Sequence, residues 1–198
     1  PLVDYINKHK LITSPYNSSF QLLEELKKGG FIIYIRHADK FENESSHQIR
    51  SALDSFESVT ANKYTHPHYE QGHALSEYGK VQSWILNKIF NDLEIPMNKV
   101  ISSPIKRCRE TAEIITELKV ESSNLLLYDG ILNSSEINKI KVKQLSLFQN
   151  SFSNDNNTLI VAHGFPVLQR IGINANIGQS DTLLLKKKSD GNIHVVGW

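Results

Sequence analysis

The chain has 198 residues and carries 22 lysines and arginines against 21 aspartates and glutamates, a formal net charge of +1. This balance excludes a global basic field of the kind that attracts nucleic acid, and no apolar run approaches the ~18 residues of a membrane span. The length suits one domain with a sizeable core, so residues 1–198 are expected to form a single domain.

Cysteine usage and the N-terminus bear on the compartment. Cys108 is the one cysteine, so an internal disulfide is impossible and a reducing compartment is favoured. The first residues, PLVDYINKHK, contain no apolar stretch typical of a signal peptide. We therefore favour a cytoplasmic protein, while the mature form of an exported protein fits the same residues. The sequence does not indicate the oligomeric state.

The stretch 19–36 predicts a helix followed by a buried strand. Ser18 or Ser19 can cap a helix over 19–28, and a Gly-Gly pair would end it. The apolar stripe of this helix is formed by Phe20, Leu22, Leu23 and Leu26. The run FIIYI at 31–35 then has the apolar, β-branched composition of a strand buried on both faces of a parallel sheet.

Residues 39–73 show no clear periodicity. A connection of this length inside a compact domain usually carries function, and we interpret it as a lid or specificity insertion over the end of the first strand. Its histidines His66, His68 and His73 match no standard set of metal ligands, so no metal site is predicted.

The clearest helical pattern covers 76–91. Its apolar residues recur at helical spacing, and we expect this stripe to face the core: Val81, Trp84, Ile85, Ile89 and Phe90. Residues 99–102 then predict a short strand. Ser103-Pro104 is expected to start the next helix, with serine as the cap and proline in the first turn. Cys108 lies on the apolar face of that helix, which indicates a buried structural thiol.

The second half of the chain continues the alternation of strands and helices. We expect strands at 125–128 and 158–162, helices at 134–150 and after Pro166, and two closing strands at 182–186 and 192–197 around a Ser-Asp-Gly turn. Lys186, Lys187 and Lys188 are interpreted as a solvated strand end. The alternation predicts an α/β fold, a three-layer sandwich with a mainly parallel central sheet flanked by helices.

Polar side chains gather where three of these strands end. The first strand runs into Arg36 and His37, the strand at 99–102 leads to Arg107, and the strand at 158–162 ends at His163-Gly164. In a parallel sheet these ends share one edge, where open α/β sheets bind ligands. Two guanidinium groups and two imidazoles around one point suit a tetrahedral dianion, above all a phosphoryl group.

Four motifs in this order resemble those of the histidine phosphatase superfamily, the phosphoglycerate-mutase-like family, branch 1. They are YIRHA at 34–38, LSEYGKVQ at 75–82, SSPIKRCRETA at 102–112 and IVAHG at 160–164. Each is weak alone, and their order and spacing together make a strong signal over residues 31–170. The first motif departs from the family pattern in one respect, because Ala38 stands where the family has glycine. Alanine is small, and we expect it to be tolerated.

The resemblance implies a phosphoglycerate-mutase-like fold and a metal-independent phosphatase without a cofactor. His37 would attack phosphorus and carry the phosphoryl group as a phosphohistidine, which water then hydrolyses. Arg36, Arg107, His163 and Gly164 would surround the phosphoryl oxygens. The second ring nitrogen of His37 is expected to donate to a fixed acceptor such as a backbone carbonyl. The substrate would be a small phosphorylated molecule or a phosphoprotein, either a phosphomonoester or a phosphoramidate.

The general acid that would protonate the leaving group is the weakest assignment. Many relatives place a carboxylate after the third strand, where this chain offers Glu136 and Asp129. Asp39, Glu42 and Glu44 are further candidates. Some relatives that act on phosphohistidine or acid-labile phosphates have no such acid, so its absence also stays open.

Two other functions remain open from the sequence. One is phosphotransfer of the phosphoglycerate-mutase type, which we rank lower because the chain is short and lacks the residues expected after His37. The other is a catalytically inactive protein that binds a phosphorylated ligand. The presence of Arg36, His37, Arg107 and His163 together argues against the inactive protein.

Overall fold

The computed structural model describes residues 16, 18–40, 74–128 and 134–198. Its helices are α2 (Ser19–Lys28), α5 (Glu77–Asp92), α6 (Lys106–Ile115), α7 (Ser134–Gln149) and α8 (Phe165–Arg170), with a 3-10 turn η2 (Asn124–Leu126). Its strands are β1 (Ile32–Arg36), β2 (Met97–Ser102), β3 (Val120–Ser122), β4 (Asn157–Ala162), β5 (Thr182–Lys187) and β6 (Ile193–Gly197). Within these ranges no helix is long and apolar enough to cross a membrane. Of the insertion predicted for 39–73, only Asp39 and Lys40 lie among the described residues.

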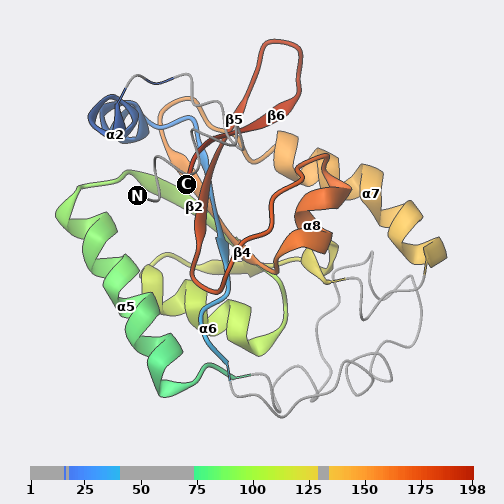
Figure 1. Ribbon diagram of the computed structural model, residues 1–198, viewed down its shortest axis with the longest axis horizontal. Helices are drawn as coiled ribbons and strands as arrows, with labels where there is room; N and C mark the ends of the chain where they lie inside the picture. The colour runs from blue at the N-terminus through green and yellow to red at the C-terminus, as the bar shows by residue number, and fades with distance from the viewer. Residues whose placement is uncertain (1–15, 17, 41–73, 129–133) are drawn as a thin grey trace.

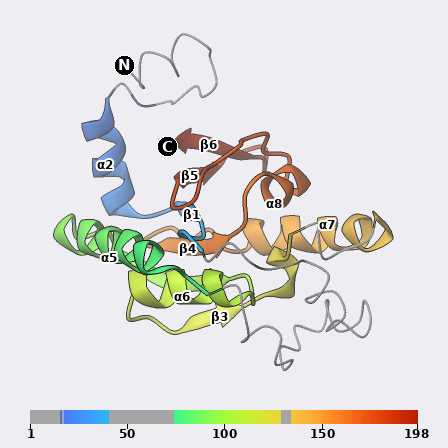
Figure 2. The same ribbon diagram turned by 60° about the horizontal axis from the view of Figure 1, so that its bottom comes forward.

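The described strands form one sheet in the order β3-β2-β4-β1-β5-β6. The first four strands are parallel, and β5 and β6 extend the sheet as an antiparallel hairpin beside β1. Figures 1 and 2 show α5 and α6 together on one side of the sheet and α7 with α8 on the other. The predicted three-layer α/β sandwich with a mainly parallel sheet is therefore confirmed.

Strand β1 lies in the middle of this sheet, and both of its faces are buried. Ile33 and Ile35 pack into the core shared with α2, α5 and α6, while Ile32 and Tyr34 pack into the core shared with α7 and α8. All four side chains are fully buried. This is the environment that the continuous apolar run predicts, because a strand covered on both faces has no polar side.

Helix α2 has the ends that the sequence predicts. The Ser18 side chain accepts a hydrogen bond from the Gln21 backbone N–H at 3.1 Å, which identifies Ser18 as the cap. Gly29 follows the helix at φ +90°, a conformation that favours glycine. The predicted apolar stripe is wrong at Phe20, which is exposed, because only the side of α2 that bears Leu26 packs on the core.

Helix α5 faces the opposite way from the prediction. The buried residues of α5 are Gly79, Ser83 and Phe90, whereas Val81, Trp84, Ile85 and Ile89 are exposed. The small side chains of Gly79 and Ser83 let the helix lie close to its neighbours, so the packed face is the one with the less apolar sequence. Of the predicted core stripe around Trp84, only Phe90 is in the core.

Two further predictions about local structure are wrong. Helix α6 begins at Lys106 rather than at Ser103-Pro104, because the backbone N–H of Ser103 still bonds Val161 of β4 at 2.9 Å. The apolar run at 125–128 is not a strand, since Leu126 and Leu127 bond back to Ser123 and Asn124 in a 3-10 turn. Strand β3 precedes this turn. A short buried apolar run does not by itself distinguish a strand from a turn.

Candidate active site

The candidate side chains lie at the carboxyl edge of the sheet, where β1, β4 and β2 end side by side. Arg36 pairs with Ala162 across β1 and β4, so His37 and His163 follow neighbouring strand ends directly. Their ring centroids are 5.4 Å apart. Ser102 pairs with Val161, which brings the start of α6 and its Arg107 to the same edge.

A cavity of about 320 Å³ opens at this edge. Its described walls are formed by Arg36, His37, Lys40, Arg107, Tyr128, His163, Gly164, Phe165, Pro166 and Asn176. The structure thus brings together Arg36, His37, Arg107, His163 and Gly164, the five residues grouped as a phosphate site from the sequence. The cationic side chains at the cavity make it suitable for a phosphoryl group.

His37 is almost fully buried, and its ring is held in one orientation. The ring Nδ1 lies 2.8 Å from the backbone carbonyl oxygen of Ala38. A carbonyl only accepts, so Nδ1 donates and Nε2 keeps its lone pair. Burial, together with the positive charge of Arg107, lowers the pKa of His37 well below its ordinary value of 6.5. Both effects favour the neutral, nucleophilic imidazole.

Ala38, whose carbonyl oxygen fixes His37, is itself held by helix α6. The backbone N–H of Ala38 donates to Thr111 Oγ1 at 3.1 Å, and the Thr111 hydroxyl donates to the carbonyl oxygen of Arg107 at 2.7 Å. The backbone N–H of His37 donates to the Ala162 carbonyl oxygen at 2.9 Å. The position of His37 therefore depends on both β4 and α6.

Arg36 and Arg107 reach the cavity from different elements. Arg36 leaves the end of β1, and its Nη1 donates to the Ile177 carbonyl oxygen at 2.7 Å. Arg107 lies in the first turn of α6 and is buried, with its guanidinium carbon 5.6 Å from the centre of the Tyr128 ring. Each guanidinium group is thus fixed in place, and both lie among the walls of the cavity.

His163 is enclosed by neighbouring side chains. Its Nε2 lies 3.0 Å from Ser103 Oγ, and its ring meets the Tyr128 ring edge-on at 4.7 Å. Cys108 Sγ lies 3.7 Å from the same Nε2. Burial lowers the pKa of His163 well below 6.5, and the positive charge of Arg107 acts in the same direction. Because Ser103 Oγ contacts His163, it does not serve as the predicted helix cap.

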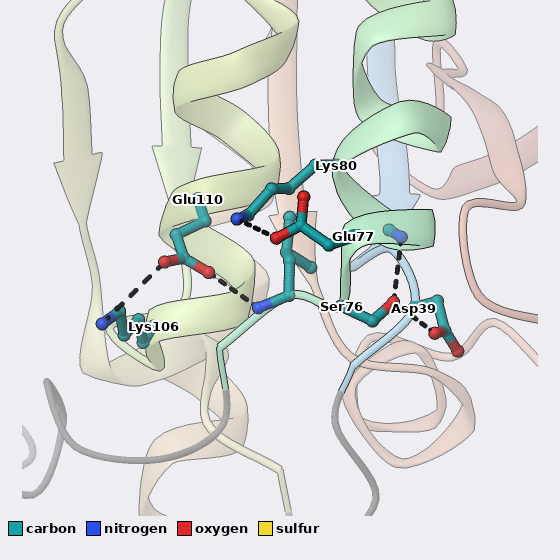
Figure 3. A network of polar contacts seen from close by, with 8 residues as sticks. Asp39, Ser76, Glu77, Lys80, Lys106 and Glu110 are labelled. Atoms are coloured by element: carbon teal, nitrogen blue, oxygen red, sulfur yellow. Dashed lines mark hydrogen bonds and ion pairs between the residues drawn. The ribbon is translucent and has the colours of Figure 1, made fainter.

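The segment LSEYGKVQ at 75–82 holds the loop that follows His37 (Figure 3). Ser76 Oγ accepts from the Gly79 backbone N–H at 3.0 Å, which caps α5, and donates to Asp39 Oδ2 at 2.5 Å. The backbone N–H of Asp39 donates to Gln82 Oε1 at 3.0 Å. This segment therefore positions the end of β1 without lining the cavity.

Comparisons with known proteins bear on the family and on the fold. A sequence model described as histidine phosphatase superfamily (branch 1) matches residues 59–126. The fold resembles that of the protein histidine phosphatase SixA complexed with tungstate, with a TM-score of 0.56 and 16% identity over 85% of this chain and 94% of that chain. Residues 59–126 therefore resemble the histidine phosphatase superfamily in sequence, and the described fold resembles that of SixA.

A second solved structure of the superfamily fold is also similar. It is a mycobacterial glucosyl-3-phosphoglycerate phosphatase, with a TM-score of 0.54 and 14% identity over 85% of this chain and 97% of that chain. No curated protein matches the sequence. At these identities the structural likeness shows the fold, and the chemistry is argued below from the residues of the cavity.

A single methyl group at Gly79 is expected to destabilise the packing of α5 on the loop after His37. An ideal Cβ at this position would overlap the carbonyl oxygen of Asp39. We expect Gly79→Ala to lower the free energy of unfolding by about 1–3 kcal/mol through this overpacking, measured by urea denaturation. A glycine-to-alanine change inside a helix otherwise stabilises by up to about 1 kcal/mol. A more stable variant would therefore contradict the close packing of α5 on Asp39.

Acid is expected to destabilise the fold through the two buried histidines. The unfolded chain protonates His37 and His163 below about pH 6.5, whereas burial keeps them neutral in the folded state. Their stabilising contribution is complete above that pH and is lost as the pH falls toward their lowered pKa values. Each histidine should lower the free energy of unfolding by up to about 1.4 kcal/mol per pH unit in this range.

Urea unfolding at about pH 7.5, 6.5 and 5.5 measures this slope, because the histidine contribution dominates that window. His163→Gln removes one of the two buried imidazoles, so its free energy of unfolding should depend less steeply on pH. A stability that stays constant or rises between pH 6.5 and 5.5 would contradict the assignment.

The structure leaves the general acid unassigned. Glu136 is buried in the first turn of α7 and is not among the described residues that line the cavity. Asp129, Glu42 and Glu44 lie outside the described residues. The carboxylate of Asp39 accepts from Ser76. No carboxylate lines the described walls of the cavity, and both Glu136 and Asp129 stay predictions.

The cavity also contains residues that sequence reasoning missed. Lys40, Tyr128, Phe165, Pro166 and Asn176 line it. Lys40 and Tyr128 could have been found, because each lies within a few residues of a strand end or motif. Asn176 lies between α8 and β5, and no pattern in the sequence marks it.

The predicted absence of a metal site concerns residues that the structure describes only in part. Within the described ranges, no group of three or more histidine, cysteine, aspartate or glutamate side chains is placed to hold a metal ion. His66, His68 and His73 lie outside those ranges.

Proposed function

We propose that this protein is a phosphatase in which His37 carries the phosphoryl group. The observation that supports this is the hydrogen bond from His37 Nδ1 to the Ala38 carbonyl oxygen at 2.8 Å. It leaves a neutral Nε2 in a cavity that also contains Arg36 and Arg107. A neutral imidazole nitrogen beside two fixed guanidinium groups is the arrangement that in-line attack on phosphorus requires.

The reaction has two steps. In the first, the lone pair of His37 Nε2 forms a bond to phosphorus, and the bond from phosphorus to the leaving oxygen or nitrogen breaks with its electron pair. In the second, an oxygen of water forms a bond to phosphorus, the bond from phosphorus to Nε2 breaks with its electron pair, and one proton of the water passes to solvent. Inorganic phosphate leaves and neutral His37 is restored. Arg36, Arg107 and His163 contact the equatorial oxygens, whose negative charge spreads in the transition state, and Gly164 leaves room for them.

The proposed charge stabilisation uses the protein's own cations, so the activity should not need a metal. The substrate is a phosphomonoester or a phosphoramidate, carried by a small molecule or a protein. The fold neighbours support both classes, since one is titled a protein histidine phosphatase and another a glucosyl-3-phosphoglycerate phosphatase. A phosphohistidine, whose imidazole leaves as a neutral ring when its second nitrogen carries a proton, or an activated ester needs little help from a general acid, and an unactivated ester would use Glu136 or Asp129.

The test is hydrolysis of an activated aryl phosphate by the full chain in the presence of EDTA, followed by rapid quenching. We expect turnover that EDTA does not reduce, and a phosphoenzyme that is stable to alkali and labile to acid. Peptide mapping should locate the phosphoryl group on His37. Turnover without any phosphoenzyme, or turnover that EDTA abolishes, would overturn the proposal.

Natural substrate classes can be separated with the same protein. If Glu136 is the acid, Glu136→Gln should leave hydrolysis of a phosphohistidine unchanged and slow hydrolysis of an unactivated alkyl phosphate. Phosphate binding without any turnover of either class would instead identify the protein as a catalytically inactive binder.

A further inference from the structure

Helix α5 presents an apolar face to solvent. Its exposed large side chains, with their exposed fractions, are Tyr78 (66%), Val81 (52%), Trp84 (57%), Ile85 (46%) and Ile89 (43%). Single exposed apolar residues are ordinary on a protein surface, but a contiguous group of this size marks an interaction site. These five residues are called the α5 outer face below.

The spacing of these residues places them on one side of the helix. Val81, Ile85 and Ile89 follow one another at intervals of four, and Tyr78 precedes them by three, so they form one stripe. The opposite side of α5 bears the buried Gly79, Ser83 and Phe90. In both Figures 1 and 2, α5 forms an outer edge of the molecule. The stripe is therefore available to a partner while the helix stays packed on its own domain.

The charges beside the stripe favour a partner that carries the same face. Glu77 pairs with Lys80 at 2.6 Å near the start of the helix, and Lys88 pairs with Asp92 at 3.5 Å near its end. These two acidic and two basic side chains leave the surface beside the stripe without net charge. This surface therefore favours neither an acidic nor a basic partner. Because each end carries both signs, the face can complement itself when a second copy is reversed.

We propose that the α5 outer face joins two copies of this chain in a symmetric dimer. A two-fold axis perpendicular to the paired helices makes them antiparallel. Their helix dipoles then point in opposite directions, which is the favourable arrangement for neighbouring helices. With the axis at the level of Ser83, the midpoint of the stripe, Val81 faces Ile85 of the other copy and Tyr78 faces its Lys88. Glu77 then lies about one residue, or roughly 1.5 Å of helix rise, from the level of Lys88 in the other copy.

This dimer leaves the catalytic edge open. None of the residues that line the cavity belongs to α5 among those described. The proposal is therefore independent of the proposed function, and its test does not depend on activity.

Sedimentation equilibrium of the full chain from about 0.1 to 100 µM tests the dimer directly. We expect a dimer that dissociates on dilution, and a monomer at all these concentrations when Val81→Asp and Ile85→Asp are combined. The matched control is Val142→Asp on α7, an exposed valine (71%) outside the α5 outer face, which should remain dimeric. A single cooperative thermal unfolding transition of the double variant would show that it still folds.

Trp84 reports on the same contact. The chain contains two tryptophans, so Trp198→Phe leaves Trp84 as the only one. Its emission should shift to shorter wavelength as concentration rises, and this shift should vanish in the Val81→Asp, Ile85→Asp background. A wild-type monomer at every concentration, or a double variant that still dimerises, would overturn the proposal.

A charge exchange distinguishes the antiparallel arrangement. Glu77→Lys alone and Lys88→Glu alone should each weaken the dimer, because each places like charges opposite one another. The combined Glu77→Lys, Lys88→Glu variant should regain affinity. Failure of the combined variant to recover would overturn the proposed axis near Ser83.

Discussion

His37→Ala is expected to abolish turnover of an activated aryl phosphate, with a fall in kcat of more than about 10³-fold, because it removes the atom that is proposed to accept the phosphoryl group. The fold should persist. The His37 side chain lines the cavity, and its backbone N–H still bonds the Ala162 carbonyl oxygen in the variant. Steady-state kinetics and quenched-flow trapping of the phosphoenzyme measure the two expected losses.

His194→Ala is a suitable control, because His194 lies on β6 and is not among the described residues of the cavity. It should retain full activity. If His37→Ala instead kept substantial turnover, a different nucleophile would be required, and Ser103, whose Oγ lies 3.0 Å from His163 Nε2, would be the first to examine.

The parts of the fold that the sequence predicts well are those with one strong local cause. The run at 31–35 is apolar on both faces, and such a strand is stable only where both faces are covered, in the middle of a sheet between two layers of helices. Ser18 and the glycine after α2 fix the two ends of that helix through hydrogen bonding and a positive φ. In these segments local propensity and tertiary packing favour the same structure, so a single sequence is enough.

The errors occur where tertiary packing decides against the local pattern. The apolar residues of α5 suggest that Trp84 is in the core, yet the packed face is the one that bears Gly79 and Ser83, whose small size permits close approach. Hydrophobic periodicity locates a helix and its stripe, but it does not reveal whether the stripe meets the core or a partner. The same limit applies to the run at 125–128, which is buried in a turn rather than in a strand.

The sequence predicts the side chains that line the centre of the candidate site, but it does not predict the contacts that hold them in position. Arg36, His37, Arg107 and His163 carry distinctive chemistry at strand ends and match motifs. The contact from Thr111 to the Ala38 backbone belongs to one of those motifs, but its purpose appears only in three dimensions. The general acid could not be fixed either way, because its candidates lie outside the described residues or away from the cavity walls.

Arg107→Ala is expected to reduce kcat/KM by roughly 30- to 1000-fold, which corresponds to about 2 to 4 kcal/mol of transition-state stabilisation. Arg107 is buried beside Tyr128, so its positive charge acts at the cavity with little screening by water. The charge on the equatorial oxygens grows as the bond to the leaving group breaks, and loss of Arg107 should therefore lower kcat as well as raise KM. Arg107→Lys should recover part of the loss, since a lysine offers the charge without the bidentate fork.

The pH profile adds a second, independent measure of Arg107. Its positive charge lowers the pKa of both His37 and His163, so its removal should raise both values. Since the proposed mechanism needs a neutral His37, the acid limb of the kcat/KM profile should move to higher pH in Arg107→Ala. Arg109→Ala is the matched control, because Arg109 lies two residues further along α6 and does not line the described cavity. If both arginine variants lost activity equally and neither moved the acid limb, the effect would come from helix α6 as a whole, and Arg107 would not be the group that holds the phosphoryl oxygens.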